Sequence, residues 1–379
     1  MSPGPAAGAT IETIEHDEQM MLRALDLAAR GWGRVAPNPM VGALVARGGE
    51  ILGEGWHAEL GGDHAEIAAL RAAGEGARGA TLYTTLEPCT HHGRTPPCCD
   101  AILEAAIGRV VIGWLDPDPV AAGGATRLRE AGVEVSLGPL EREARELIAP
   151  FLWRRARRTP YTAVKLAISL DGRISAGTGV RTAVTGEEAG NEVQRLRAGY
   201  SGILVGRATA QIDDPQLTAR GPVVPRVPPV RIVIDPGARL DPESRLGASA
   251  PHPPVWLLVS AEAPPDRIGR LEAAGVRTLE TPIAGEGLDL EAAWRSLAEE
   301  GLDSLLVEGG GRTVAGLLEA RLVQRIYLFV APVVFGEGPE AFAGSSFPRR
   351  DWRVVRREAF GDDTLIVLDP VDDRVLEEY

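Results

Sequence analysis

The sequence predicts two α/β domains in one chain, each built on its own layered sheet. The chain has 379 residues, more than one hydrophobic core usually holds. Strand-like and helix-like segments alternate in both halves, which is typical of α/β folds. A helical pattern ends at Arg158, and Thr159-Pro160 follows, where helix is disfavoured. We therefore expect a flexible N-terminal extension over 1–16, a first domain over 17–158 and a second over 159–379.

The first domain is expected to begin with a helix, because apolar residues recur at helical spacing over 18–30. Two strands follow, and the Gly48-Gly49 pair between them is typical of a hairpin turn. Strands and helices then alternate, which predicts a sheet with helices on both faces. The expected strands are 41–46, 50–57, 80–86, 109–113 and 133–136, and the expected helices are 18–30, 65–73, 98–106, 124–131 and 141–158.

The second domain shows the same kind of alternation but shares no motif with the first. Helical stretches lie between several of its strand-like runs, so a second α/β domain is expected. The proline-rich stretch 221–229 is expected to be a surface loop. The expected strands are 161–167, 202–205, 230–234, 255–259, 304–307 and 325–335, and the expected helices are 186–197, 291–299 and 314–321.

The acidic balance of the chain limits its partners. With 53 Asp and Glu against 40 Lys and Arg, the net charge is −13, which opposes tight binding to a nucleic-acid backbone. No apolar run reaches the roughly 20 residues of a membrane helix, and the N-terminus lacks a signal-peptide pattern. Three clustered cysteines suit a metal site in a reducing compartment better than disulfides. We expect a cytoplasmic protein acting on a small molecule, without a nucleic-acid or membrane partner.

A histidine, two cysteines and a glutamate are spaced as in a catalytic zinc site. His64 and Glu66 open an expected helix, Cys89 follows an expected strand, and Cys98 begins another helix. The helix dipole stabilises a thiolate at a helix N-terminus. His-x-Glu followed by Pro-Cys and a second Cys is the signature of zinc deaminases, in which the glutamate moves protons and is not a ligand. Three protein ligands leave one position of Zn²⁺ open for water.

Other interpretations stay open at this point. Cys99 competes with Cys98, because neighbouring helical side chains point about 100° apart and only one of them can ligate. If Cys99 or His91 completed a four-ligand shell, the zinc would be structural and the chain a non-catalytic module. A nucleoside, nucleotide or tRNA-base deaminase with a degenerate C-terminal domain is a further alternative. The acidic charge and the eight residues between Cys89 and Cys98 count against it.

Three segments resemble the deaminase half of the bifunctional deaminase/reductase family of riboflavin biosynthesis. They are Pro37 to Gly42, Gly62 to Glu66, and Glu87 to Cys98. The resemblance implies a cytidine-deaminase-like three-layer domain, with His64, Cys89 and Cys98 holding one Zn²⁺ and Glu66 as proton shuttle. It also implies substrate contacts from Asn38, His57, Arg94 and Thr95. A carboxamide such as Asn38 both donates and accepts hydrogen bonds, and a guanidinium such as Arg94 suits a phosphate.

The second domain carries a weaker signal of its own. The expected strand 304–307 leads through Glu308 and the glycines 309–311 into a helix, and such a turn lets a phosphate approach backbone N–H groups. Because a tight turn needs no ligand, this pattern alone leaves both interpretations open. The segments 165–174, 204–209 and 213–218 resemble the reductase half of the same family, whose fold is similar to that of dihydrofolate reductase.

The resemblance implies an NADPH site and a substrate site in the second domain. The implied NADPH contacts are Ala167, Thr209, Asp213, Gly310, Gly311, Arg312, Thr313, Val314, Ala315 and Gly316, and the implied substrate contacts are Arg181, Arg197, Leu217, Arg220 and Glu308. Because guanidinium groups fork onto phosphate oxygens, Arg197 and Arg220 are candidates for the ribose 5-phosphate. Lys165 and Glu308 are candidates for proton transfer; a structural ion pair would explain Lys165 equally well.

Together the two halves predict two consecutive reactions. The first domain would deaminate 2,5-diamino-6-(5-phosphoribosylamino)pyrimidin-4(3H)-one to 5-amino-6-(5-phosphoribosylamino)uracil, and the second would reduce the ribosyl side chain to ribityl with NADPH. Ala183 stands where the family commonly has Trp, and Pro236 where a small hydroxyl residue is common. Both departures bear on the affinity for NADPH. The resemblance also implies a homo-oligomer.

Overall fold

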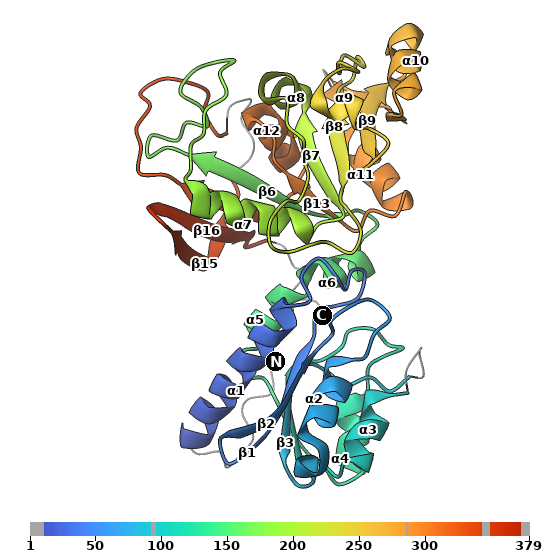
Figure 1. Cartoon of the computed structure of the whole chain (residues 1–379), viewed down its shortest axis with the longest axis vertical. Coiled ribbons are helices and arrows are strands. Elements are labelled where there is room, and N and C mark those ends of the chain that lie inside the picture. The colour runs from blue at the N-terminus through green and yellow to red at the C-terminus, as the bar shows by residue number, and fades with distance from the viewer. Residues whose placement is uncertain (1–10, 92–95, 286, 343–348, 373–379) are drawn as a thin grey trace. The chain divides into compact units, whose positions relative to one another are not determined.

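A computed structural model of the chain describes residues 11–91, 96–285, 287–342 and 349–372 (Figure 1). The chain divides between Arg155 and Ala156 into two compact units, which we call the N-terminal unit and the C-terminal unit. Each unit has its own large sheet. Within the described ranges, no helix is long and apolar enough to cross a membrane.

A mixed five-stranded sheet forms the centre of the N-terminal unit. Its strands are β1 (Gly42–Arg47), β2 (Glu50–Trp56), β3 (Thr81–Leu86), β4 (Arg109–Trp114) and β5 (Glu134–Leu137). The spatial order is β2-β1-β3-β4-β5, in which β1 is antiparallel to both neighbours and β3, β4 and β5 are parallel. The predicted hairpin is confirmed: Gly48 and Gly49 join β1 to β2 with φ of 54° and 90°, which only glycine adopts freely.

Helices cover both faces of this sheet, as predicted (Figure 1). They are α1 (Ile11–Ala29), α2 (Ala65–Ala73), α3 (Cys98–Glu104), α4 (Gly124–Glu130), α5 (Glu141–Leu147) and α6 (Ala149–Ala156), with a 3₁₀ turn, η1 (Gly74–Ala77), after α2. On one face, Met21 and Leu27 of α1 pack on Leu44 and Tyr83. On the other face, α2, α3 and α4 share a core with β1, β3 and β4. This helix–sheet–helix arrangement confirms the predicted three-layer class.

Two predicted helix boundaries were wrong. α1 begins at Ile11, so residues 11–16 are helical and do not belong to a flexible extension. The helix can extend this far because the glycines and prolines near the N-terminus, which disfavour helix, all lie before residue 9. The helix predicted over 141–158 is two helices, α5 and α6. Pro150 explains the break, because proline donates no backbone hydrogen bond and its ring crowds the preceding turn. The break changes the direction of the chain before α6.

A nine-stranded sheet forms the centre of the C-terminal unit. Its strands are β6 (Tyr161–Ile168), β7 (Gly202–Gly206), β8 (Val230–Ile234), β9 (Val255–Ser260), β10 (Arg277–Thr281), β13 (Ser304–Val307), β14 (Arg325–Val330), β15 (Trp352–Phe360) and β16 (Asp363–Pro370). The order is β10-β9-β8-β7-β13-β6-β14-β16-β15, parallel as far as β14 and antiparallel at β16 and β15. A separate ribbon pairs β11 (Ile283–Ala284) with β12 (Gly287–Leu288).

The helices of the C-terminal unit enclose a core on each face of the sheet. They are α7 (Glu187–Ala198), α8 (Arg207–Asp213), α9 (Arg245–Ala248), α10 (Pro265–Ala273), α11 (Leu290–Glu299) and α12 (Gly311–Glu319). Trp294 of α11 and Leu317 of α12 pack on one face, and Leu271 of α10 packs on the other. Because β6, β7 and β13 are parallel neighbours, the residues that follow them gather at one edge of the sheet.

The sequence missed several elements of this unit, namely α8, α9, α10, β10, β11, β12, β15 and β16. β15 contains three arginines and has no buried residue, so it lacks the apolar pattern that indicates a strand. The strand predicted over 325–335 ends at Val330, and Pro332 just beyond it cannot donate to a strand ladder.

Candidate active sites

The three predicted zinc ligands lie close together in the N-terminal unit. His64 is the residue before α2, Cys89 follows β3, and Cys98 is the first residue of α3. Nδ1 of His64 lies 3.1 Å from Sγ of Cys98 and 3.6 Å from Sγ of Cys89. Among the described residues, these three side chains form the group that could share one metal ion, because all their ligand atoms lie within 4.8 Å of one another. One imidazole nitrogen and two thiolates at this spacing fit Zn²⁺.

The electrostatics of this cluster favour a bound cation. A hydrogen bond from Cys98 lowers the pKa of Cys89 to about 4, and the same shared proton raises the pKa of Cys98. The pKa of His64 is raised, chiefly by its hydrogen bond to Cys89. The pocket therefore holds a thiolate, a thiol that donates its proton to that thiolate, and an imidazole that hydrogen-bonds to it. A divalent cation could bind all three side chains in place of these protons.

Glu66 lies beside this cluster and is not part of it. It stands in the first turn of α2 and is only 3% exposed. Burial, which disfavours a charged carboxylate, raises its pKa to about 7. A carboxyl group that titrates near neutral pH can both accept and return a proton, as a general acid/base must.

Cys99 is separate from the ligand cluster. Its side chain is fully buried in the core between α2, α3 and α4, and its Sγ faces the carbonyl oxygen of Pro88 at 3.5 Å. Burial raises the pKa of its thiol to about 12, so it stays protonated. Of the two neighbouring cysteines, the structure brings only Cys98 to His64 and Cys89.

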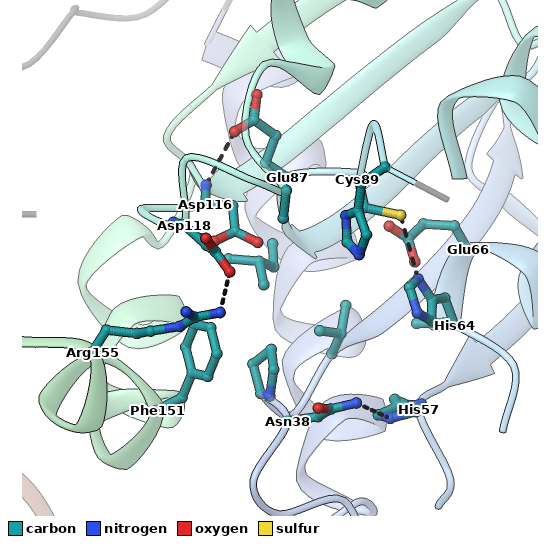
Figure 2. Close-up of a pocket in the computed structure, with 16 residues that line it drawn as sticks. Asn38, His57, His64, Glu66, Glu87, Cys89, Asp116, Asp118, Phe151 and Arg155 are labelled. Atoms are coloured by element: carbon teal, nitrogen blue, oxygen red, sulfur yellow. Dashed lines mark hydrogen bonds and ion pairs between the residues drawn. The ribbon is translucent and has the colours of Figure 1, made fainter. Parts of the chain in front are cut away.

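A pocket of about 200 Å³ opens in front of the cluster (Figure 2). Asn38 and His57 line it together with His64, Glu66 and Cys89. Nδ1 of His57 donates to the carbonyl oxygen of Asp63 at 3.0 Å, because a carbonyl can only accept. Nε2 of His57 is therefore the acceptor for the Asn38 amide nitrogen at 3.3 Å. Burial lowers the pKa of His57, which keeps the ring neutral in this role.

A second pocket, of about 380 Å³, lies at the edge where β6, β7 and β13 end. It collects nine of the residues predicted for the second site: Lys165, Ala167, Arg181, Arg197, Thr209, Asp213, Leu217, Glu308 and Gly310. Residues 311–316 form the first turns of α12 and do not line this pocket. Arg220 does not line it either; it hydrogen-bonds to Gln216 and Thr218.

Arg197 and Glu308 form a buried two-pronged ion pair in this pocket. Nε and Nη2 of Arg197 donate to the two carboxylate oxygens of Glu308 at 2.6 and 2.8 Å, and Nη1 donates to the carbonyl oxygen of Thr218. Burial would raise the pKa of Glu308, but Arg197 outweighs it and the net shift is downward. Glu308 therefore stays ionised, and the fork of Arg197 is already engaged by a carboxylate.

Lys165 is the titratable group of this pocket that is best placed to give up a proton. It is partly buried, and this burial lowers its pKa, although Glu308 acts in the opposite direction. Its Nζ lies 5.8 Å from the ring centre of Phe329. An ammonium group with a lowered pKa is a stronger acid than a free lysine.

The glycine turn between β13 and α12 leaves room for close backbone approach. A Cβ on Gly309 would lie 2.9 Å from Cβ of Thr313, and a Cβ on Gly206 would lie 2.4 Å from Oγ1 of Thr313. Larger residues at either position would push α12 away from β7. The N-terminus of α12 therefore stays close to the pocket, where its N–H groups suit a phosphate of a dinucleotide such as NADPH.

Both halves of the chain match known families. The zinc-binding region of cytidine and deoxycytidylate deaminases matches residues 14–114, and the RibD C-terminal domain matches residues 160–366. The Escherichia coli K12 riboflavin biosynthesis protein RibD is 41% identical over 332 residues, which covers 84% of this chain and 89% of that protein. The chain belongs to the RibD family.

Solved RibD structures share the whole fold. The Acinetobacter baumannii RibD structure has a TM-score of 0.76 and 31% identity, covering 95% of this chain and 100% of that one. The Thermotoga maritima structure is described as a diaminohydroxyphosphoribosylaminopyrimidine deaminase and 5-amino-6-(5-phosphoribosylamino)uracil reductase. It has a TM-score of 0.77 and 34% identity, covering 94% of this chain and 99% of that one.

Membership of the RibD family decides between the three functions that the sequence left open. The chain is a bifunctional enzyme of riboflavin biosynthesis, with a deaminase domain followed by a reductase domain. The predicted fold class, a cytidine-deaminase-like domain before a reductase domain of the dihydrofolate-reductase type, is confirmed. A nucleoside deaminase with a degenerate second half and a non-catalytic zinc module are both set aside.

Sequence reasoning missed part of the wall of the RibD deaminase pocket. The missed lining residues include Glu87, Asp116, Asp118, Phe151 and Arg155. Glu87 braces the wall, since its carboxylate accepts from the backbone N–H groups of Asp116 and Ala125. Its position next to Pro88-Cys89 was a usable signal. Arg155 belongs to the basic run 154–158, which by its pattern indicates a solvated helix end and not a pocket wall. Arg94 and Thr95, predicted to bind substrate, lie outside the described residues.

Proposed function

We propose that residues 17–158 deaminate the diaminopyrimidinone ribosylamino 5-phosphate, and that residues 159–379 reduce the ribosyl group of the product with NADPH. The observation that carries the first half is a buried glutamate with a pKa of about 7 beside a cluster of three metal-binding side chains. The second half rests on Lys165, a partly buried cation beside the Arg197–Glu308 pair at the end of β6.

In the deaminase, His64, Cys89 and Cys98 would hold one Zn²⁺ per chain. Zinc supplies the acidity that makes water a nucleophile at neutral pH. Glu66 would accept a proton from the attacking water and pass it to the ring nitrogen as the hydroxyl adds to the ring carbon. It would then take the proton of that hydroxyl and pass it to the amino group, whose bond to the carbon breaks as ammonia leaves and the carbonyl forms. Asn38, turned by its bond to His57, presents its carbonyl oxygen as an acceptor for N–H groups of the substrate ring.

In the reductase, Ala167, Thr209, Asp213 and the Gly310 turn would hold NADPH, which supplies the hydride. The reaction breaks the bond between C1 and the ring oxygen of the ribose, adds hydride to C1 and leaves a hydroxyl on the former ring oxygen. Lys165 gives that oxygen its proton. Glu308, ionised by its pairing with Arg197, keeps the Lys165 ammonium protonated until the transfer. Arg181 and Leu217 line the same pocket and would contact the substrate.

The test separates the two reactions. Purified protein is loaded with zinc and given the diaminopyrimidinone substrate, and ammonia release is measured without NADPH. NADPH oxidation is then measured with the deaminated intermediate supplied directly. Both activities are expected. Absence of ammonia release would contradict the deaminase half, and absence of NADPH oxidation would contradict the reductase half, independently of each other.

The remaining expectations concern the protein as a whole. The substrate is a small molecule, and we propose a cytoplasmic homo-oligomer without a nucleic-acid or membrane partner. Light scattering on the purified protein would measure the mass of the assembly. A mass equal to one 40.2 kDa chain would contradict the proposed oligomer.

A further inference from the structure

β8 carries an arginine at a position that its neighbours give to the apolar core. This strand lies between β7 and β9 (Figure 1). Arg231 of β8 stands opposite Ile203 of β7 and Val255 of β9, whose side chains are both fully buried in one core. Val233, two residues further along β8 and therefore on the same face, belongs to this core as well. Arg231 itself is only 1% exposed. A leucine or isoleucine would suit this position, so the arginine calls for another explanation.

The guanidinium group of Arg231 is held by backbone carbonyl oxygens and one hydroxyl. Nη1 donates to Oγ of Ser249 at 2.8 Å and to the carbonyl oxygen of Gln216 at 3.3 Å. Nη2 donates to the carbonyl oxygens of Ser249, at 2.7 Å, and of Pro253. None of these partners is acidic, and burial lowers the pKa of Arg231 to about 10, which leaves the group charged at neutral pH. Arg231 therefore connects the segment before Leu217 to the turn at 249–253.

The segment that receives this hydrogen bond is strained at Leu217. The φ of Leu217 is 50°, a left-handed conformation that leucine rarely adopts. Such a conformation persists only where the surrounding structure imposes it. Before Leu217, Arg231 binds the carbonyl oxygen of Gln216. After it, Nη1 of Arg197 binds the carbonyl oxygen of Thr218 at 3.2 Å. The two arginines thus hold the backbone on both sides of the strained residue.

The left-handed conformation directs Leu217 into the wall of the C-terminal pocket. Its side chain is 2% exposed, packs in the same core as Val233 and lines the pocket that also holds Lys165. A return of φ to negative values would turn the Cβ of Leu217 away from its present direction. Arg231 does not line this pocket, so its effect on a bound substrate passes through Leu217.

We propose that Arg231 is a positioning residue of the reductase, which holds Leu217 in its left-handed conformation against the substrate. This assignment rests on the proposed reductase function, in which Leu217 contacts the substrate. It also explains the arginine in the core, because only a long side chain with several donors spans from β8 to both the 216–218 segment and the turn at 249–253.

The test compares two buried arginines of the same sheet, with NADPH oxidation measured on the deaminated intermediate. Arg231→Met keeps the length of the side chain and removes its donors. It is expected to raise KM for the intermediate about tenfold, the effect of losing one charged hydrogen bond, with kcat and KM for NADPH little changed. Arg325→Met is the matched control, because Arg325 is largely buried, pairs with Asp369 and does not line the pocket. It is expected to lower the urea midpoint of the C-terminal unit and to leave both KM values unchanged.

A double-variant cycle tests the connection to Leu217. Because glycine adopts a left-handed φ without strain, Leu217→Gly needs no anchoring of its backbone, but it loses the side-chain contact and is expected to raise KM for the intermediate. In that background, Arg231→Met is expected to add little. If the two effects on KM multiply, Arg231 acts elsewhere and the assignment is overturned. Arg231→Lys, which keeps the charge and some of the donors, is expected to recover part of the loss; if Arg231→Met does not fold, it takes its place in these assays.

Hydrogen exchange adds a measurement that does not depend on activity. In the peptide 214–220, the N–H of Arg220 donates to Oε1 of Gln194 at 2.8 Å. This peptide is expected to exchange faster in Arg231→Met and at the wild-type rate in Arg325→Met. Unchanged exchange, or a KM for the intermediate equal to that of an active wild type, would overturn the Arg231 assignment alone. A wild type that does not oxidise NADPH would overturn the reductase function and this assignment with it.

Discussion

Glu66 is buried and Glu308 is largely buried, yet the pKa values of these two glutamates shift in opposite directions. Burial raises the pKa of Glu66 to about 7, and the charge of His64 offsets this only in part. Burial acts on Glu308 in the same sense, but the two-pronged pairing with Arg197 reverses the net shift. The comparison teaches that burial alone does not set the role of a carboxyl group. Its partner decides whether it moves protons or stays charged.

The two pockets also differ in how the chain assembles them. The ligand cluster and Glu66 come from one stretch, 64–98, in which two short helices begin. In the C-terminal pocket, the paired residues Arg197 and Glu308 stand 111 positions apart.

Removal of zinc should separate the two pockets most completely. Chelation is expected to abolish ammonia release, because the water loses its activation, and to leave NADPH oxidation on the deaminated intermediate unchanged. Metal analysis of the untreated protein should give one zinc per chain. Ammonia release that survives complete loss of zinc would contradict the role of His64, Cys89 and Cys98.

Glu66→Gln tests the proton shuttle while keeping the shape of the side chain. We expect ammonia release to fall by about a hundred- to ten-thousand-fold, the usual contribution of a general acid/base. Zinc content and NADPH oxidation should be unaffected. A variant that keeps its zinc and at least a tenth of its deaminase activity would show that another group moves the proton.

Lys165→Met tests the corresponding group in the reductase, with a similar or somewhat smaller loss expected. The pH profile sharpens the test. The protonated ammonium is present below the pKa of Lys165 and is lost as pH rises through it. The pKa of a free lysine is about 10.4. Because burial lowers the pKa of Lys165, NADPH oxidation should decline at a pH below that value. A profile that stays flat up to that pH would exclude Lys165 as the proton donor.

Breaking the Arg197–Glu308 pair should destabilise the C-terminal unit. Arg197→Met leaves a buried carboxylate without its counter-ion, which typically costs about 3–5 kcal/mol of unfolding free energy. The double variant Arg197→Met/Glu308→Leu should cost less, because the carboxylate is removed together with its counter-ion. Urea unfolding of the three proteins measures both values. If the single and double variants had equal unfolding free energies, the unpaired carboxylate would cost nothing, as expected for a solvent-exposed ion pair.

Cys99→Ala should have the smallest effect. It removes a buried sulfur from a packed core, so we expect a loss of about 1 kcal/mol in unfolding free energy, with zinc content and ammonia release unchanged. The adjacent Cys98→Ala is the matched comparison and should lose the zinc. Loss of zinc in Cys99→Ala would reverse the assignment of the two cysteines.

Much of the fold was readable from local pattern. The bounds of α2, β8 and β13 agree with the prediction to the residue. Each is a short run whose pattern ends clearly at both sides, so local sequence is enough to define where the element begins and ends. β15 was missed because an arginine-rich edge strand depends on its neighbours and not on its own apolar pattern. β16 has an apolar run over 365–368, which was a usable signal. The break at Pro150 was in the sequence and could have been used.

The residue types at 64–98 and the alternation of strand-like and helix-like segments were enough to predict the zinc cluster and two consecutive α/β domains. Those features depend on residue types at short spacing, at points where strands end and helices begin. The tertiary structure alone decided that Cys98 faces His64 while Cys99 is buried in the core, that Glu308 engages Arg197, and that α6 brings Arg155 to the deaminase pocket. The physical reason is that burial and charge pairing depend on side chains far apart in the chain, whose meeting no local pattern records.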